Sequence, residues 1–297
     1  MNKSIRPVEY KLATNNDIDQ ISQFIADLNI CEENHIAYCG DNSDEIANSL
    51  TEDITDIPFN QSFLVATQDD KIIGVIGFDA DLGRNSAEVW GPFIKETRWD
   101  IALEMWNKMT QLLPEEMDLI SMFLNNKNER CIELVDKLGF SKESEQSILI
   151  FDNDDFNKLD DISLKELSVD YYQEMQSLHD KVFPNTYYSG EEILERLNSN
   201  RKVFIETDDN NLSGYIYVEA EPEYGEGNIE FFAVCEREKG KGVGSKLLRN
   251  ALKWLLSFES INEISLCVNS QNSKAINLYK KVGFKKKQQL YYFIKKC

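Results

Sequence analysis

The chain has 297 residues, 42% of them hydrophobic and 11% aromatic, which suffices for packed cores and suits about two ordinary domains. The formal net charge of −20 argues against a nucleic-acid partner, because phosphate binding needs a basic surface. No apolar run approaches the roughly 18–20 residues that span a bilayer, and no signal-peptide core is present, so we expect a cytoplasmic protein without a membrane partner.

The charge is unevenly divided along the chain. Residues 236–297 hold 14 Lys and Arg against 4 Asp and Glu, a net of +10, whereas residues 1–235 hold 18 against 48, a net of −30. This division favours a cationic partner for the acidic body and an anionic partner for the C-terminal segment. An acidic surface that only aids solubility is the alternative.

The six cysteines include no C-x-x-C pair, which favours free thiols in a reducing compartment. Cys31, His35 and Cys39 recur every four residues and could share one helix face. No fourth ligand is evident, and the spacing matches no common zinc motif. We therefore expect no metal.

In chain order, the first half contains helices, strand-like runs, a helix, a strand and the helix of residues 125–140. That last stretch, NNKNERCIELVDKLGF, matches NSQNSKAINLYKKVGF at residues 269–284 with an offset of 144, which places Asn128 on Asn272. A repeat of this length indicates two copies of one domain fold rather than a solenoid.

The repeat predicts two domains, over residues 1–153 and 160–297, with the acidic stretch 151–161 as the natural linker. Periodicity in the second copy predicts helices near 169–182, 191–197, 242–257 and 273–282, and strands near 202–206, 212–219, 228–234, 263–268 and 287–294. Strands and helices in this order predict an α/β domain with helices on both faces of the sheet.

A glycine-rich stretch, KGKGVG at residues 239–244, follows the strand IEFFAV and opens a helix. Strand, glycine turn and helix start together favour binding of a phosphate by backbone N–H groups. A Walker loop would need G-x-x-x-x-G-K-[ST], and a dinucleotide fingerprint would need G-x-G-x-x-G with an acid after the next strand. Residue 245 is Ser and the next strand ends at Asn269, so neither motif fits.

The loop, together with N-x-x-A-x-x-x-Y-x-x-x-G-F from Asn272 to Phe284, resembles the GNAT superfamily of acyl-CoA-dependent N-acyltransferases. The family's loop is [RQ]-x-x-G-x-[GA], and Lys239 stands where it usually has Arg or Gln. The resemblance covers about residues 162–297. It implies two tandem GNAT-like domains, each a mixed, mostly antiparallel sheet flanked by helices on both faces, the N-terminal copy being degenerate.

By this resemblance, acetyl-CoA is the co-substrate and the pantetheine arm pairs with one strand as an added strand would. The glycines allow close approach of the backbone to the pyrophosphate, and Lys239, Lys241 and Lys246 add charge. Asn272 would help to position the turn, and capping of the helix at Ser273 is its simpler role. The implied cofactor-binding residues are Phe232, Ala233, Val234, Lys239, Gly240, Lys241, Gly242, Val243, Gly244 and Asn272.

Acyl transfer to an amine needs a base for the ammonium and an acid for the leaving thiolate. Tyr279 stands where these enzymes commonly keep a tyrosine acid; a core tyrosine is the alternative. Glu230 is the candidate base, with Glu219, Glu221 and Glu223 as rivals. The loop between the first two helices often lines the acceptor site in this family, so Phe183, Tyr187 and Tyr188 are candidate pocket walls, or simply packed aromatics.

The first copy lacks these features. On the offset of 144, Glu96, Arg98 and Asp100 replace the three glycines, and Val135 replaces Tyr279. We expect this copy to support the second domain or to shape its acceptor cleft. Its three tryptophans could face the partner domain, although core burial is the simpler expectation; they are Trp90, Trp99 and Trp106.

The function expected from these residues is direct transfer of an acetyl group, in a ternary complex, to a primary amine of a small molecule or peptide. The acidic body favours a cationic amine. The alternative is a non-catalytic acyl-CoA-binding or interaction protein built of paired GNAT folds.

Overall fold

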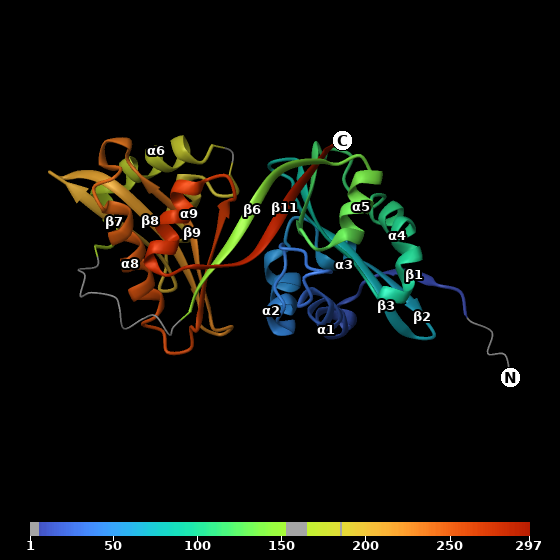
Figure 1. The fold of residues 1–297 in the computed structure, drawn as a ribbon. Coiled ribbons are helices and arrows are strands. Elements are labelled where there is room, and N and C mark those ends of the chain that lie inside the picture. Colours follow the sequence, from blue (N-terminus) through green and yellow to red (C-terminus); the bar gives the residue numbers. More distant parts are fainter. Residues whose placement is uncertain (1–5, 153–164, 185) are drawn as a thin grey trace. The chain divides into compact units, whose positions relative to one another are not determined.

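The computed structural model describes residues 6–152, 165–184 and 186–297 (Figure 1). These residues belong to two compact units, one of Met1–Gln146 together with Gln289–Cys297, the other of Ser147–Gln288. Most of the predicted linker, 151–161, lies outside the described residues. None of the described helices has the length and apolar character needed to cross a membrane.

The first unit is a mixed, mostly antiparallel sheet with helices against it. Its sheet order is β1-β2-β3-β4-β5-β11, in which the β4–β5 pair is parallel. The strands are β1 Glu9–Leu12, β2 Leu64–Gln68, β3 Lys71–Asp81, β4 Ser86–Ile94, β5 Leu119–Asn125 and the end of β11 Lys285–Lys296; the helices are α1 Ile18–Asn29, α2 Ser43–Asn48, α3 Phe59–Ser62, α4 Ala102–Met109 and α5 Glu129–Lys137.

The second unit repeats this plan with the sheet order β6-β10-β9-β8-β7. Only β9 and β10 are parallel among the pairs β7–β8, β8–β9 and β9–β10. The strands are the end of β6 Ser141–Asp152, β7 Arg201–Asp208, β8 Asn211–Glu221, β9 Glu226–Val234 and β10 Glu263–Asn269; the helices are α6 Tyr172–Val182, α7 Gly190–Arg196, α8 Val243–Leu255 and α9 Ser273–Val282.

These bounds confirm the predicted element order except for β1, which precedes the first helix and was not predicted. Each sheet has helices on both faces, as expected. On β8 the side chains alternate between two cores. Ile216 and Val218 pack in the cluster that contains α8 and α9, whereas Tyr215 and Tyr217 pack in the cluster that contains α6 and α7. The period of two in a strand places successive side chains on opposite faces, so both faces of β8 are buried.

The division into units differs from the contiguous domains expected at 1–153 and 160–297. The last nine residues lie in the first unit, where Leu290 pairs with Asn125 and Lys296 with Leu119 along β5. Phe293 is buried in the core of that unit. β6 in turn crosses the other way, since residues from Ser147 onward belong to the second unit. Strand pairing between residues so far apart leaves no local sign in the sequence.

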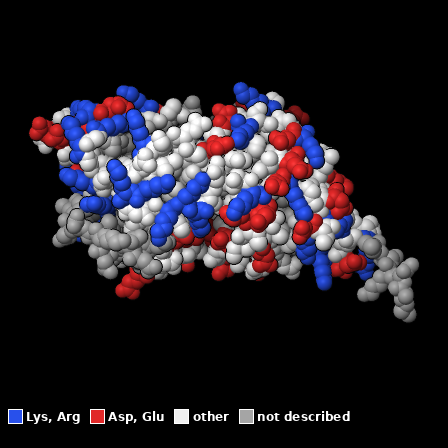
Figure 2. Space-filling model, in the orientation of Figure 1, with Lys and Arg blue, Asp and Glu red and all other residues white. Residues whose placement is uncertain are grey.

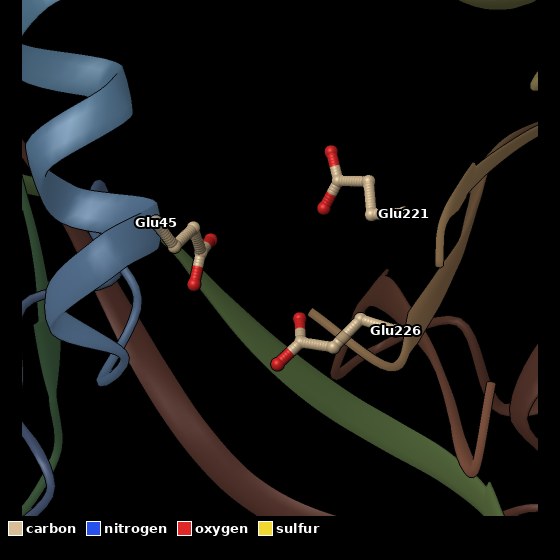
Figure 3. Close-up of side chains that lie close together, drawn as sticks. All are labelled: Glu45, Glu221 and Glu226. Carbon is tan, nitrogen blue, oxygen red and sulfur yellow. The ribbon is translucent and has the colours of Figure 1, made fainter. Parts of the chain in front are cut away.

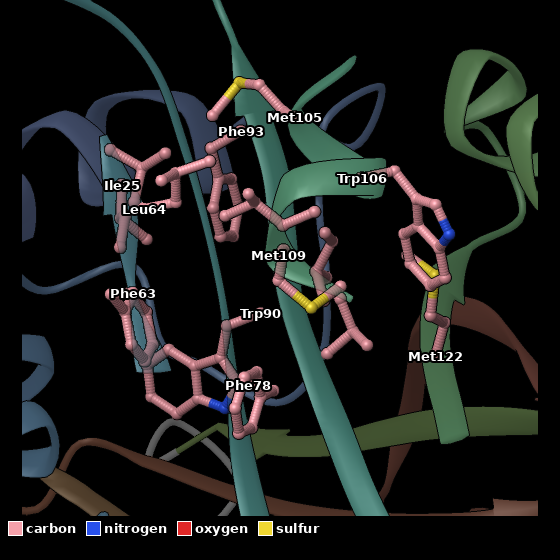
Figure 4. Close-up of a cluster of buried hydrophobic side chains, with 14 of the residues drawn as sticks. Ile25, Phe63, Leu64, Phe78, Trp90, Phe93, Met105, Trp106, Met109 and Met122 are labelled. Atoms are coloured by element: carbon pink, nitrogen blue, oxygen red, sulfur yellow. The ribbon is translucent and has the colours of Figure 1, made fainter. Parts of the chain in front are cut away.

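Two tryptophans of the first unit are core residues, as the simpler expectation had it. Trp90 is 5% exposed and Trp106 is 3% exposed, while Trp99 is partly buried against the same core. In Figure 4 the indole of Trp90 stands edge-on to Phe63, with a ring separation of 6.0 Å. Aromatic rings in this geometry stabilise a core beyond the area that they bury.

The residues between α1 and α2 do not form the shared helix face considered for Cys31, His35 and Cys39. α1 ends at Asn29, and the segment continues as turns with one isolated bridge, Ile36 to Leu124. His35 Nδ1 lies 3.0 Å from the Asn29 carbonyl, and the buried Cys39 thiol donates to the Ile36 carbonyl at 3.7 Å. All six cysteines are free thiols, as predicted.

The core of the second unit contains one amide without a partner. Asn250, on α8, is fully buried, and neither its Nδ2 nor its Oδ1 has a hydrogen-bond partner among the described residues. A buried unpaired polar group costs about 1–3 kcal/mol. We expect Asn250→Leu, which keeps the branching of the side chain, to raise the free energy of unfolding by about 1–3 kcal/mol in urea denaturation followed by circular dichroism. A lower free energy of unfolding would contradict this reading; Asn250→Ala, which leaves a cavity, is the control.

Candidate functional site

The glycine loop of the second unit has a backbone that favours anion binding. Gly240 has φ +81° and Gly242 has φ +88°, a region that side chains with a Cβ rarely adopt. A Cβ at either position would have no neighbour within 4 Å, so conformation rather than space calls for glycine. α8 begins at Val243, directly after Gly242, and no side chain caps it. The first amides of α8 therefore keep their capacity to bind an anion.

Gly244 has a different role from the other two glycines. A Cβ there would lie 3.0 Å from the side chains of Leu278 on α9 and Phe232 on β9. The absence of a side chain thus lets α8 pack closely against α9 and the sheet. Gly244 places the anion-binding end of the helix, in addition to the backbone contact that was predicted for it.

Three lysines predicted to supply positive charge are each paired with a carboxylate. Lys239 pairs with Glu236, Lys241 with Glu238 at 3.2 Å, and Lys246 with Glu206 at 3.8 Å. Lys274, near the start of α9, was not predicted; it is exposed and forms no salt bridge with a described residue. The hydrogen bond and charge of Lys239, and to a smaller extent the charge of Lys274, lower the pKa of Glu236, which places both lysines near the loop. Figure 2 shows Lys and Arg gathered over this unit.

The strands beside the loop separate as they approach it. β9 and β10 pair from Glu226–Glu263 to Ile229–Leu266, and no further register joins them in the part of the chain that the structure describes. β9 nevertheless continues to Val234, paired on its other side with β8. The β10-facing edge of residues 230–234 therefore lies outside the ladder, where an extended amide-bearing chain could pair as an added strand. Phe232, Ala233 and Val234, all predicted cofactor residues, lie on this edge.

Glu230 is placed by a β-bulge. Tyr217 pairs with Phe231 and Val218 with Ile229, so Glu230 is the extra residue on β9. Its carboxylate accepts a hydrogen bond from the Tyr187 hydroxyl. Burial raises the pKa of Glu230, and Glu219 adds to this, whereas the Tyr187 hydrogen bond and the nearby arginines oppose it. The structure thus joins two residues that the sequence had suggested separately, a base and a pocket wall.

Tyr279 lies on α9 with its ring in the core. It is 7% exposed, and its ring packs against Phe284 at 5.8 Å and Phe232 at 6.1 Å. Among the described residues its hydroxyl has no hydrogen-bond partner. Burial raises the pKa of Tyr279, and the neighbouring Cys267 of β10 adds to the shift, so the phenol stays protonated at neutral pH. The role of Cys267 as a neighbour of this tyrosine was not foreseen.

The rival bases differ in their surroundings. Glu219 is 7% exposed and is paired with Arg196 at 3.1 Å and Arg201 at 3.0 Å, which occupies its carboxylate. Glu221 is the cross-strand partner of Glu226 in the β8–β9 hairpin (Figure 3; Glu45, also drawn there, belongs to the first unit). Burial, and then the surrounding glutamates, raise the pKa of Glu221 to about 7. Glu223 is exposed.

The aromatic residues between α6 and α7 fall into two classes. Phe183 packs against Phe231 at 5.2 Å, and Tyr188 lies beneath the Arg196 guanidinium at 4.1 Å. Tyr187 is 50% exposed and turns its hydroxyl to Glu230. Of the three predicted pocket walls, Tyr187 is the one that offers a polar group beside the candidate base.

The helix after β10 begins with the predicted cap. The Asn272 side chain accepts a hydrogen bond from the Ala275 amide at 3.2 Å, and Asn128 does the same for Cys131 at 3.2 Å in the first unit. The repeat is therefore reproduced in capping geometry at the offset of 144. On this alignment Val135, which is fully buried, does replace Tyr279.

Upstream of β5 and β10, however, the offset is 140. The Lys95 amide donates a hydrogen bond to the Ile73 carbonyl, and the Cys235 amide donates one to the Ser213 carbonyl. Both residues of the second pair lie 140 positions after those of the first. The residue-by-residue replacement of Gly240, Gly242 and Gly244 by Glu96, Arg98 and Asp100 is therefore wrong, because the second copy has four more residues between β9 and β10. Pattern matching at one offset could not reveal an insertion between two matching segments.

The corrected alignment still separates the two loops. Ala102 takes the place of Gly242 and has φ −56° instead of +88°. The 3-10 turn Glu96–Ile101 continues directly into α4, and Arg130 donates to both the carboxylate and the carbonyl of Glu96 at 3.1 and 3.2 Å. The first unit thus has neither the positive-φ turn nor the free anion-binding helix start.

Comparison with known proteins agrees with this geometry. Residues 169–284 match the model of the acetyltransferase (GNAT) family. The chain is 37% identical over 67 residues to an N-alpha-acetyltransferase of Sulfurisphaera tokodaii, covering 23% of this chain and 40% of that protein. It is 33% identical over 79 residues to a spermine/spermidine N(1)-acetyltransferase of Bacillus subtilis, covering 25% of this chain and 52% of that protein. The chain thus spans about half, or less, of the length of these relatives.

The fold of the whole chain has a counterpart among solved structures. A tandem GNAT protein from the clavulanic acid biosynthesis pathway is similar with a TM-score of 0.70 and 13% identity, over 98% of both chains. At this identity the likeness shows the fold. Residues 169–284 therefore form a domain of the GNAT acetyltransferase family, within a chain that has the tandem GNAT fold.

Proposed function

We propose that the second unit transfers the acetyl group of acetyl-CoA to a primary amine in a ternary complex. One observation carries this proposal: an uncapped helix start behind two positive-φ glycines lies at the end of β9, whose edge leaves the ladder after Ile229. The helix start suits a diphosphate and the strand edge suits an amide-bearing arm, the two features of coenzyme A. The first unit lacks the loop and does not bind the donor.

The donor would be held along one line of backbone. The amides from Gly240 to Gly244 would hold the pyrophosphate, and the edge of residues 232–234 would hold the pantetheine arm. Lys274, which is exposed near the loop, supplies a positive charge for the remaining phosphate; Lys239, Lys241 and Lys246 would have to exchange their carboxylate partners to do so. The Asn272 cap keeps α9, and with it Tyr279, in register with the loop.

The reaction requires proton transfers at the amine nitrogen and at the departing thiolate. An amine with a pKa of about 10.4 is almost wholly protonated at pH 7, so Glu230 removes a proton, directly or through water. The amine nitrogen then attacks the thioester carbonyl, which the backbone amide near Val234 polarises. The carbon–sulfur bond breaks, and Tyr279 donates its proton to the departing thiolate. The nitrogen, which still carries one proton more than an amide, gives that proton to the Tyr279 phenolate directly or through water. Products are the amide and the free thiol of coenzyme A.

The acceptor is proposed to be a cationic amine. Two of the proteins to which this chain is similar are named for acetylation of spermine or spermidine and of an alpha-amino group. Carboxylates of Glu221, Glu226 and Glu230 share one strand pair, and the raised pKa values of Glu221 and Glu230 include mutual repulsion among the glutamates of β8 and β9. A positively charged acceptor would relieve that repulsion.

The test is release of coenzyme A thiol with a panel of polyamines, aminoglycosides and peptides. We expect turnover with at least one cationic amine. We expect Gly242→Val to weaken coenzyme A binding by at least about fivefold, since a β-branched residue at φ +88° is strained by about 1–3 kcal/mol. Calorimetric titration of coenzyme A measures this loss.

Gly139→Val is the matched control. Gly139 also has a positive φ, +78°, with open space around its Cβ, but it lies in the first unit. We expect coenzyme A affinity to stay unchanged in this variant. Equal weakening in both variants, or no heat from the wild-type chain, would overturn the proposal. Binding without turnover across the panel would favour a non-catalytic acyl-CoA-binding protein.

A further inference from the structure

The second unit contains one histidine, and it lies at the centre of the residues that place Glu230. His179, on α6, is fully buried. Its ring packs edge-on to Phe231 at 4.7 Å and lies 5.4 Å from Phe183. Phe231 follows Glu230 on β9 and also contacts Tyr187 at 4.9 Å. The imidazole therefore shares neighbours with both members of the Tyr187–Glu230 pair.

The hydrogen bonds of His179 define its tautomer. Nε2 lies 2.8 Å from the carbonyl of Tyr188, and a carbonyl can only accept, so Nε2 carries the proton. Nδ1 lies 2.5 Å from the Tyr215 hydroxyl, which then donates to it. Burial lowers the pKa of His179, in agreement with a neutral ring. The neutral ring thus has one donor, bound to the Tyr188 carbonyl, and one acceptor, bound to the Tyr215 hydroxyl.

His179 holds the segment that carries Tyr187. The Tyr188 carbonyl is bound by His179, and the Tyr188 ring is held by Arg196. The next residues are held as well, since the Gly190 amide donates to Asp180 at 2.8 Å and a Cβ at Gly190 would lie 2.6 Å from the backbone of Gln176. Tyr187 itself is half exposed, and its polar contact is the bond to Glu230. Its position therefore depends on Tyr188.

We infer that His179 is a positioning residue: its Nε2–H holds the Tyr188 carbonyl so that the Tyr187 hydroxyl reaches the Glu230 carboxylate at the acceptor side of the site. The kinetic consequence rests on the proposed function. Without the hydroxyl, Glu230 loses a hydrogen bond that favours its charged form, so it would take up its proton at higher pH. The titratable and charged groups that act on this carboxylate are Tyr187, Tyr188, Arg196, Arg201, Glu219, Glu221 and Cys267.

The test is the pH profile of kcat/KM for the amine. In a plot of log kcat/KM against pH, protonation of the acceptor amine alone gives a slope of one below the pKa of the amine. Protonation of Glu230 as well makes the slope steeper below a break point. We expect Tyr187→Phe and His179→Leu each to move the break point up by about one pH unit. Glu230→Gln should abolish the break. The double variant of Tyr187 and His179 should move it no further than either single variant, because the two residues act through one bond.

His179→Gln is the conservative rescue, because its amide N–H can reach the Tyr188 carbonyl; it should restore the wild-type break point. His35→Leu is the matched control, since this second histidine lies in the first unit and also contacts a backbone carbonyl, that of Asn29 at the end of α1. Additive shifts in the double variant, or a fall in kcat/KM in His179→Leu without any shift, would overturn the inference.

A second measurement separates this inference from the proposed function. If no amine is acetylated by the wild-type chain, the proposed function fails, but amide hydrogen exchange of residues 186–190 still tests the positioning role. We expect His179→Leu to accelerate that exchange by at least about tenfold and His179→Gln to return it to the wild-type rate. Unchanged exchange in His179→Leu would overturn the inference whatever the activity.

Discussion

Replacing Tyr279 by phenylalanine is expected to lower kcat by at least about a hundredfold while coenzyme A affinity stays within about twofold of the wild type. The hydroxyl has no hydrogen-bond partner among the described residues, so its removal leaves no buried group unpaired. The ring contacts with Phe232 and Phe284 are kept. The change therefore isolates the proton that the proposed reaction assigns to the departing thiolate.

The expected size follows from the protons involved. A thiol with a pKa of about 8.5 departs from an attacked thioester as the thiolate unless an acid is within reach, and general acid catalysis of such a step is worth roughly 10²–10⁴. Because burial raises the pKa of Tyr279, its proton is present throughout the neutral range. Steady-state kinetics with the best amine measures kcat, and calorimetry measures coenzyme A binding.

Tyr171→Phe is the matched control for this experiment. Tyr171 is a partly buried tyrosine of the second unit, whose ring lies under Lys165 at 4.8 Å, and it belongs to no part of the proposed site. Removal of the Tyr171 hydroxyl should leave kcat unchanged. If Tyr279→Phe kept kcat within about threefold of the wild type, water or another group would be the acid and the assignment would fail.

Removing the last nine residues is expected to destabilise the first unit rather than the second. The deletion of residues 289–297 exposes the β5 edge along the seven pairs from Leu290–Asn125 to Lys296–Leu119. It also removes Phe293, which is 3% exposed in the core of the first unit. Phe293→Ala alone should cost about 3–5 kcal/mol of unfolding free energy, and the deletion more.

Three of the four tryptophans lie in the first unit, which makes the measurement selective. In a Trp254→Phe background, tryptophan fluorescence during urea unfolding reports that unit alone. We expect Phe293→Ala and the deletion to unfold at a lower urea concentration than the wild type. Lys296→Ala, whose side chain is exposed, should leave the midpoint unchanged. An unchanged fluorescence transition in Phe293→Ala and in the deletion would contradict the strand assignment.

Much of the second unit could be predicted because its signals are local. The glycine loop, the Asn272 cap and the alternating β8 each depend on residues within one turn or strand, where period and capping rules apply. The same holds for the absence of the loop from the first copy, which has no glycine between Pro92 and Leu138. The offset of 144 is correct for α5 and α9, since their caps match. It is wrong upstream of β5 and β10, where the offset is 140 because the second copy has four additional residues between β9 and β10.

The sequence by itself determined the order of elements, the repeat, the anion-binding turn and the family that these resemble. Only the tertiary structure decided that β11 completes the first unit, that a bulge turns Glu230 toward Tyr187, and that His179 holds the intervening segment. Each of these depends on contacts between residues that are far apart along the chain, such as Asn125 with Leu290 or Glu230 with Tyr187. Local pattern carries no information on such pairs, because they form only when packing brings separate elements together.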